Sequence, residues 1–274
     1  MEITLLGTGD TTGTPTVGCQ CETCERAKTN GVERSRFSVH IHNPLTESSL
    51  LIDVSPDFRH QFLENDVGLP EAAIITHIHF DHLDGLGNAF RILRELDVFG
   101  SDQIDNTTGE SVAATICERY AYLDAVTVHP IEPYETETVC GLEYRLLPVH
   151  HPPFDSYGLV IRDPETGGRL GITGDTSYAI PARTRAELEG VDLLLADALV
   201  NAEFCEGHPA GGRDHNEDGI PMTFGTKHMT REGALSLAEE LGVGDVRLVH
   251  ASHFYSASDA FVEPLAVDGE RYEI

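Results

Sequence analysis

The sequence predicts a mixed α/β fold, and three observations support this prediction. Short apolar segments rich in β-branched residues, which are typical of buried strands, recur along the 274 residues. Amphipathic segments with capping residues lie between some of them, as at 58–65 and 231–241. Histidine and aspartate residues directly follow several of the apolar segments, and open α/β sheets hold their ligands at the carboxyl ends of strands.

Each element is expected from its local pattern. The expected strands are residues 3–6, 37–41, 49–54, 72–75, 125–130, 142–149, 157–161, 169–172, 191–196 and 246–249. The expected helices are residues 58–65, 89–96, 111–120 and 231–241. Thr230 is the expected N-cap of the last helix, and Gly242 ends it.

Two polar stretches are expected to be loops. Residues 100–109 separate two expected helices and contain few apolar side chains. Residues 201–226 are rich in glycine and proline and contain His208, Asp214 and His215. We expect this second stretch to be a flexible loop near the substrate.

The sequence His77-Ile78-His79-Phe80-Asp81-His82 follows the expected strand at 72–75. His77 and His79 face the same way if the extended geometry persists. Asp81 and His82 then turn with the chain toward a second point. Imidazole nitrogens and carboxylate oxygens are ligands that zinc accepts, so the arrangement indicates two adjacent metal ions.

Further donors follow two other strands. His150 and His151 come directly after the strand at 142–149, and since adjacent residues of an extended chain face opposite ways, only one is expected to bind metal. Asp175 follows the strand at 169–172 in the sequence Thr-Gly-Asp-Thr. Taken alone, Asp175 is better explained as a turn or N-cap residue than as a ligand.

Cys19, Cys21 and Cys24 form a compact Cys-x-Cys-x-x-Cys set. Three thiolates suit a tetrahedral zinc site that lacks one more ligand. The alternative is three unrelated thiols. Cys117, Cys140 and Cys205 are scattered and are most simply core or semi-buried thiols.

The His-x-His-x-Asp-His spacing resembles the signature of the metallo-β-lactamase superfamily of dinuclear hydrolases. The resemblance implies a four-layer αββα sandwich and covers almost the whole chain as a single domain, residues 1–274. It implies that His151 rather than His150 is the ligand, that Asp175 bridges both ions and that His250 is the last ligand. It places His228 in the active site, and Asp81 and His228 are the expected catalytic residues. The implied dinuclear set is His77, His79, Asp81, His82, His151, Asp175 and His250.

One subset of the superfamily carries an additional zinc site. In the PhnP-type phosphodiesterases, which act on phosphoribosyl 1,2-cyclic phosphate, a Cys-x-Cys-x-x-Cys set joins a histidine three residues past the last catalytic ligand. By this resemblance Cys19, Cys21, Cys24 and His253 bind a structural zinc, in a small loop around residues 18–26. The chain departs from the pattern in its long 201–226 stretch and in Gly158-Leu159, where Gly-Tyr is commoner.

The resemblance implies a phosphodiesterase with two zinc or manganese ions in the active site and one structural zinc. The expected substrate is a small, in particular cyclic, phosphodiester such as phosphoribosyl 1,2-cyclic phosphate. The alternatives are a tRNA 3′-processing endonuclease of the ribonuclease Z type, another hydrolase of this fold, and a non-catalytic metal-binding protein. The endonuclease needs a basic arm to grip RNA, which the sequence lacks.

The charge of −28, from 46 acidic against 18 basic residues, disfavours nucleic acid as a partner. Lys28 and Lys227 are the two lysines of the chain, and this acid-rich, lysine-poor composition resembles that of halophile proteins. No stretch approaches the roughly 20 apolar residues of a membrane helix. The first residues lack a basic segment, so we expect a cytoplasmic protein without a signal peptide, and the relatives suggest a homodimer.

Overall fold

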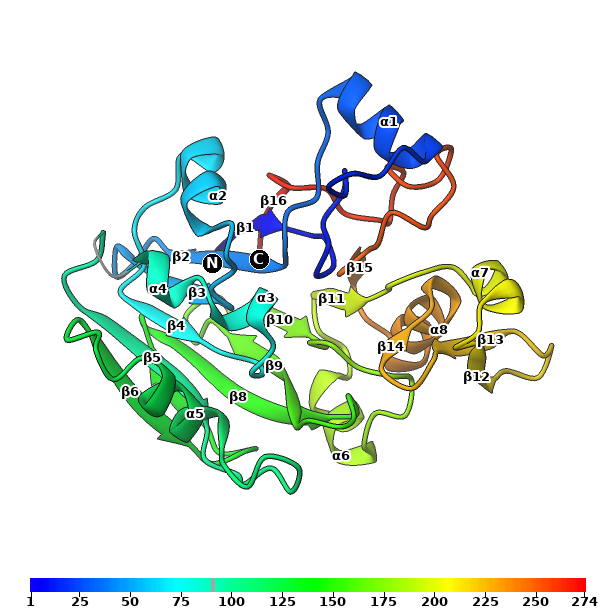
Figure 1. Cartoon of the computed structure of the whole chain (residues 1–274). Coiled ribbons are helices and arrows are strands. Elements are labelled where there is room, and N and C mark those ends of the chain that lie inside the picture. Colours follow the sequence, from blue (N-terminus) through cyan, green and yellow to red (C-terminus); the bar gives the residue numbers. More distant parts are fainter. Residues whose placement is uncertain (90–91) are drawn as a thin grey trace.

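The structure, a computed structural model, describes residues 1–89 and 92–274, and two large sheets dominate it (Figure 1). In spatial order, the strands of the first sheet are β16 (Arg271–Glu273), β1 (Glu2–Gly7), β2 (Ser38–Asn43), β3 (Ser48–Ile52), β4 (Ala72–Ile74), β5 (Leu96–Ser101) and β6 (Val126–Ile131). Those of the second are β15 (Asp245–Val249), β11 (Leu193–Asp197), β10 (Arg169–Ile172), β9 (Ser156–Arg162), β8 (Leu142–Val149) and β7 (Glu137–Val139).

The two sheets pack face to face, because each presents one apolar face to the other. Leu5, Ile41 and Leu50 of the first sheet share one core with Tyr144 and Leu159 of the second. A second core lies on the opposite face of the second sheet, under helices. The helices are α1 (Glu22–Asn30), α2 (Phe58–Asn65), α3 (Phe80–Leu83), α4 (Leu86–Ala89), α5 (Val112–Arg119), α6 (Ala182–Leu188), α7 (Ala202–Gly207) and α8 (Arg231–Leu241).

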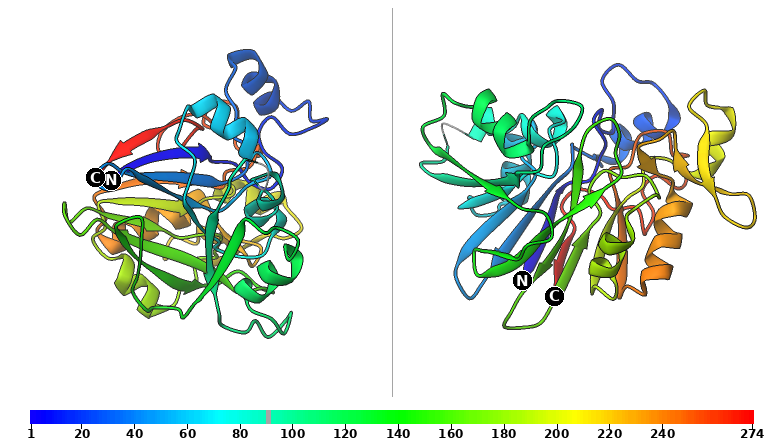
Figure 2. Two further views of the ribbon diagram at one scale, coloured as in Figure 1. Left: turned by 90° about the vertical axis from the view of Figure 1, so that its left-hand side faces the viewer. Right: turned by 90° about the horizontal axis from the view of Figure 1, so that it is seen from below.

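Helices cover both outer faces of this sandwich (Figure 2). α5 packs on β5 and β6 and α2 packs on β1, whereas α6 and α8 pack on the second sheet. The four-layer αββα arrangement that the sequence predicts is thereby confirmed. No helix among the described residues has the length and apolar character needed to cross a membrane.

The helix predicted for residues 89–96 is wrong for the residues of this range that the structure describes. α4 ends at Ala89, residues 92–95 are not helical, and β5 begins at Leu96; residues 90 and 91 lie outside the described structure. β5 pairs in parallel with β4 and with β6, and it buries Leu96 and Val98. Its Gly100 and Ser101 belong to the predicted loop 100–109, so that prediction is also wrong at its start.

The prediction of a flexible loop at residues 201–226 is wrong as well. It contains α7, β12 (Gly212–His215) and β13 (Pro221–Phe224), and the two strands form a small sheet with β14 (His228–Met229), which follows the predicted loop. Met222 and Thr223 are buried, and β13 packs against both α7 and α8. We call α7 together with β12, β13 and β14 the flap; it lies beside α8 at the right of Figure 1.

Candidate metal centre

The seven donors predicted for the dinuclear set converge at one edge of the two sheets. His77, His79, Asp81 and His82 come from the connection after β4, and His151 follows β8. Asp175 follows β10, where Gly174 has φ +60° and would place a Cβ atom 2.5 Å from a backbone oxygen, so the turn requires glycine. His250 follows β15 with φ 56°, a conformation that non-glycine residues rarely adopt.

The donors form two groups, each with its ligand atoms within 4.8 Å of one another. In the first, His79 Nδ1 lies 2.9 Å from His77 Nε2 and 3.3 Å from His151 Nε2. In the second, Asp81 Oδ2 lies 3.6 Å from His82 Nε2 and 3.7 Å from His250 Nε2. Residues far apart in the chain are thereby brought into two small clusters.

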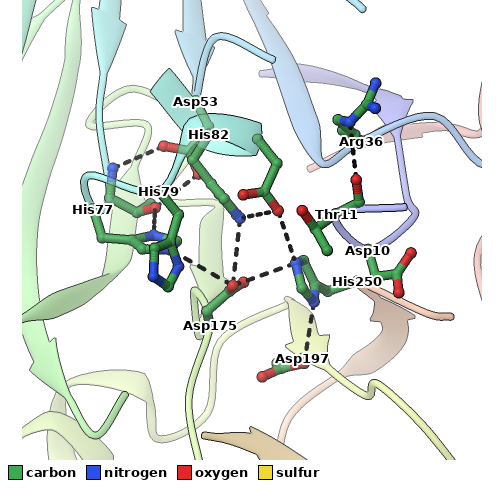
Figure 3. A network of polar contacts seen from close by, with 12 residues as sticks. Asp10, Thr11, Arg36, Asp53, His77, His79, His82, Asp175, Asp197 and His250 are labelled. Atoms are coloured by element: carbon green, nitrogen blue, oxygen red, sulfur yellow. Dashed lines mark hydrogen bonds and ion pairs between the residues drawn. The ribbon is translucent and has the colours of Figure 1, made fainter. Parts of the chain in front are cut away.

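Asp175 lies between the two groups (Figure 3). Its Oδ2 atom is 3.7 Å from His77 Nε2, 3.4 Å from His82 Nε2 and 3.3 Å from His250 Nε2. One carboxylate oxygen thus faces imidazoles of both clusters. This is the placement that a bridging ligand needs.

Hydrogen bonds determine which nitrogen of each ring faces the cluster. Thr76 Oγ1 donates to Asp53 Oδ2, so His77 Nδ1–H donates to Thr76 Oγ1 at 3.0 Å. His82 Nδ1–H donates to Asp53 Oδ2 at 2.6 Å. His151 Nδ1–H donates to the carbonyl oxygen of Lys227 at 3.0 Å. In all three rings Nε2 is therefore the nitrogen that faces the candidate metal site.

The electrostatics also fit a cation. Burial lowers the pKa of His77 and His79, and lowers that of His151 to about 3, so these rings are neutral. In the second group burial alone would lower the pKa of His250, but Asp175 and Asp81 raise it to about 9. A proton on His250 thus balances the carboxylates when no cation does. His82 Nε2 and His250 Nε2 are buried without a hydrogen-bond partner among the described residues, and a metal ion would satisfy both.

The structure distinguishes between the two adjacent histidines. His151 belongs to the first group, whereas His150 is exposed and pairs through Nδ1 with Ser177 Oγ at 2.7 Å. His228 lies next to the donors, with its ring centroid 4.8 Å from that of His151 and 5.0 Å from that of His250. A ring nitrogen of His228 also lies within 4.8 Å of donor atoms of Asp175 and His250.

Sequence reasoning missed the role of Asp197. This buried carboxylate ends β11, and its Oδ2 accepts hydrogen bonds from His228 Nδ1–H and from the backbone N–H of Thr176, both at 2.9 Å. The sequence did contain a signal for this role. Asp197 stands at the end of an apolar strand, and Asp175 stands shortly after one. Asp53, which follows β3, accepts hydrogen bonds from both Thr76 and His82 and has φ 57°.

The cysteine set forms a separate cluster at the start of α1. Cys19 Sγ and Cys21 Sγ lie 3.5 and 3.4 Å from His253 Nδ1, and Cys24 completes the group. The backbone N–H of Thr16 donates to Cys24 Sγ and that of Cys21 donates to Cys19 Sγ, and such bonds stabilise thiolates. Three sulfur atoms and one imidazole nitrogen are a set that suits tetrahedral zinc.

Comparison with known proteins identifies the family. The model of the beta-lactamase superfamily domain matches residues 49–251, well over half of the chain. The protein therefore belongs to the metallo-β-lactamase superfamily, as its fold and histidine clusters indicate.

Two curated relatives match nearly the whole chain. One is an octanoyltransferase of Porphyromonas gingivalis, 40% identical over 266 residues that span 92% of this chain but only 46% of that protein. The other is a ribonuclease Z of Synechococcus, 26% identical over 95% of this chain and 88% of that protein. The chain thus spans about half the length of the first of these relatives.

Two solved structures share the fold. A diphosphatase from the PhnP family superposes with a TM-score of 0.76 at 23% identity, covering 99% of this chain and 96% of that one. Zinc-bound PqqB from Methylobacterium extorquens superposes with a TM-score of 0.75 at 22% identity over the full length of both chains. The resemblance to PhnP expected from the sequence is confirmed at the level of fold.

Proposed function

We propose that the protein is a dinuclear metal-dependent phosphodiesterase that hydrolyses a small, in particular cyclic, phosphodiester. Phosphoribosyl 1,2-cyclic phosphate is the example that the PhnP resemblance suggests. The observation that carries the proposal is the position of Asp175 Oδ2, which faces imidazoles of both histidine clusters. A pair of divalent cations in such a centre supplies Lewis-acid activation of water and balances the charge of phosphoryl oxygens.

The donor residues can be assigned to individual metal ions. His77, His79 and His151 would hold one ion, Asp81, His82 and His250 the other, and Asp175 both. The neutral rings of His77, His79 and His151 are already in the protonation state that binds metal, whereas His82 and His250, whose pKa the nearby carboxylates raise against the effect of burial, would each release a proton on binding. Zinc and manganese both accept this set of nitrogen and oxygen donors. The four residues Cys19, Cys21, Cys24 and His253 would hold a structural zinc.

His228 is the residue we assign to proton transfer. Its Nδ1–H donates to Asp197, so Nε2 is its free nitrogen, and no described residue offers that atom a hydrogen bond. When this ring carries a second proton, Nε2–H can donate to a phosphoryl oxygen or protonate the leaving oxygen. Asp197 acts on the reaction only by orienting this ring.

A substrate panel tests the proposal. The purified protein is assayed on bis-p-nitrophenyl phosphate, phosphoribosyl 1,2-cyclic phosphate and precursor tRNA, before and after chelation and with zinc or manganese restored. Metal-dependent hydrolysis of the small diesters supports the proposal. Cleavage of precursor tRNA alone would favour the function of the ribonuclease Z relative. No hydrolysis of any substrate would refute the proposal and leave another hydrolase of this fold or a non-catalytic metal-binding protein.

A variant tests the role of His228. His228→Ala should lower kcat about 10²- to 10⁴-fold, the range expected when a general acid is lost. The metal content, measured by elemental analysis, should remain that of the parent protein, because the seven donors are intact. Loss of metal from this variant would show that His228 is a ligand, as its position within 4.8 Å of donors of Asp175 and His250 permits.

A further inference from the structure

A cavity of about 710 Å³ lies on the outer face of the first sheet. Residues of a strand alternate between the two faces of a sheet. Ile3 and Leu5 of β1 pack in the core between the sheets, so Glu2 and Thr4 lie on the outer face, where both line the cavity. Residues 66–71, which connect α2 to β4, line it as well.

This cavity is separate from the candidate metal centre. Glu2 and Ser49, which line it, lie near the amino ends of β1 and β3. The carboxyl ends of the same strands lead to Gly9, which bridges to Ala251, and to Asp53, which binds His82. The strands thus carry the cavity at one end and approach the metal centre at the other.

Carboxylates from several segments line the cavity, namely Glu2, Glu47, Asp66, Glu71 and Glu273. Within the described part of the chain, none of them belongs to an ion pair. Glu2 and Glu273 are directly opposed on β1 and β16, where the two chain ends lie side by side (Figure 2). Like charges in this position destabilise a sheet. A cation held in the cavity would relieve the repulsion.

His40 adds a buried acceptor to the wall of the cavity. Its side chain is 3% exposed, and its Nε2–H donates to the carbonyl oxygen of Gly68 at 3.1 Å. Burial lowers the pKa of His40 to about 4, so the ring is neutral and Nδ1 carries a lone pair. Nδ1 has no hydrogen-bond partner among the described residues, although the ring lines the cavity. The buried nitrogen therefore calls for a hydrogen-bond donor from a ligand.

We propose that this cavity binds an aliphatic polyamine, a flexible cation that carries several ammonium groups on a methylene chain. The ammonium groups donate to the carboxylates of Glu2 and Glu273 and to His40 Nδ1. The methylene groups pack on Val67 and Leu69, which also line the cavity. The volume falls within the range of about 300–1,000 Å³ that is usual for small-molecule sites.

A metal ion is a poorer occupant of this cavity. The metal-ligating atoms that lie close together among the described residues belong to the histidine, aspartate and cysteine clusters already described, and none of them comes from this wall. Arg271, the arginine of the wall, donates through Nη2 to the carbonyl oxygen of Asn65 and forms no ion pair with a described carboxylate. The negative charge is spread along the cavity, as a ligand with several separated charges requires.

The test compares spermidine binding in two variants that lose the same charge. Isothermal titration of the metal-loaded protein with spermidine, at 0.15 M potassium chloride to screen distant charges to about 8 Å, should give saturable binding to one site. Glu2→Gln combined with Glu273→Gln should weaken this binding about ten-fold, because two ion pairs are lost. The control combines Glu217→Gln with Asp218→Asn, two exposed residues between β12 and β13, and should bind as the parent does.

A crystal structure with spermidine provides the second measurement, and it should show an ammonium group within hydrogen-bond distance of His40 Nδ1. Three results would overturn the proposal. One is the absence of saturable binding. Another is an equal loss of affinity in both variants, which would show that the net charge of −28 attracts spermidine without a site. The third is spermidine bound elsewhere in the crystal with this cavity empty.

Discussion

At the scale of single residues, Asp53 shows how a side chain outside the donor set shapes the candidate centre. Its two carboxylate oxygens accept hydrogen bonds from the backbone and hydroxyl groups of Thr76 and from His82 Nδ1–H. Because Thr76 in turn accepts from His77, one buried carboxylate fixes the ring orientation of two histidines that belong to different clusters.

This arrangement predicts the effect of Asp53→Asn. Asparagine has one acceptor oxygen, so its amide nitrogen must face either the backbone N–H of Thr76 or the Nδ1–H of His82, and one of these two hydrogen bonds is lost. Either loss disturbs the segment or the ring that would hold the metal. Loss of such an orienting partner lowers metal affinity about 10- to 100-fold. A competition titration with a chelator measures the affinity, and Asp97→Asn, which removes an exposed partner of His129, is the control. Equal affinity in Asp53→Asn and the parent would contradict the assignment.

The sequence made the donors predictable but not their hydrogen-bond partners. The spacing of His77, His79 and His82 is local, so it is visible without the fold. The pairing of Asp197 with His228 crosses 31 residues and depends on how β11 and β14 pack. His150 and His151 were separable only by resemblance, because alternation along a strand does not say which face meets the centre.

At the scale of elements, the ends of strands and the caps of helices were the most predictable features. Thr230 caps α8 as its position before an amphipathic run indicates, and Gly242 ends the helix with φ 58°. The flap was not predictable as structure, because its strands are two to four residues long and glycines separate them. One local signal was overlooked: the side chain of Asn201 caps α7 by accepting from the N–H of Phe204.

The cap of α8 carries a stability prediction. Thr230 Oγ1 accepts from the N–H of Gly233 at 3.0 Å and donates to the carbonyl of Pro221 at 2.8 Å, so it joins the helix to β13. Thr230→Ala should lower the free energy of unfolding by about 1–2 kcal/mol, since it removes a cap and leaves buried polar groups unpaired. Urea denaturation measures the change. Thr230→Ser keeps the hydroxyl group and should lose clearly less; an equal loss would point to the methyl group instead.

At the scale of the whole molecule, the dominant property is the excess of 46 acidic over 18 basic residues. Like charges spread over one compact body repel one another and oppose folding, and salt screens this repulsion. The screening length falls from about 10 Å at 0.1 M salt to about 3 Å at 1 M. We therefore expect salt to stabilise the folded chain, as the halophile-like composition predicts.

The unfolding temperature should accordingly rise as potassium chloride increases from 0.1 to 1 M. For a chain of this size, each 1 kcal/mol gained raises the unfolding temperature by about 2–4 °C. Thermal scans monitored by circular dichroism at constant pH measure the shift. A temperature that stays constant or falls over this range would show that the acidic surface does not limit stability.

The contacts of residues 7–10 bear on the order in which the donors of the candidate metal centre come together. Gly9 bridges to Ala251, Ala251 N–H donates to Thr8 O, and Asp10 N–H donates to Ala251 O. The segment carrying the last donor, His250, is therefore held by the beginning of the polypeptide. During synthesis on the ribosome, a chain that has reached residue 200 holds six of the seven donors but not the one that closes the second cluster. The second of the proposed metal sites would therefore be complete only after residue 250 has been synthesised.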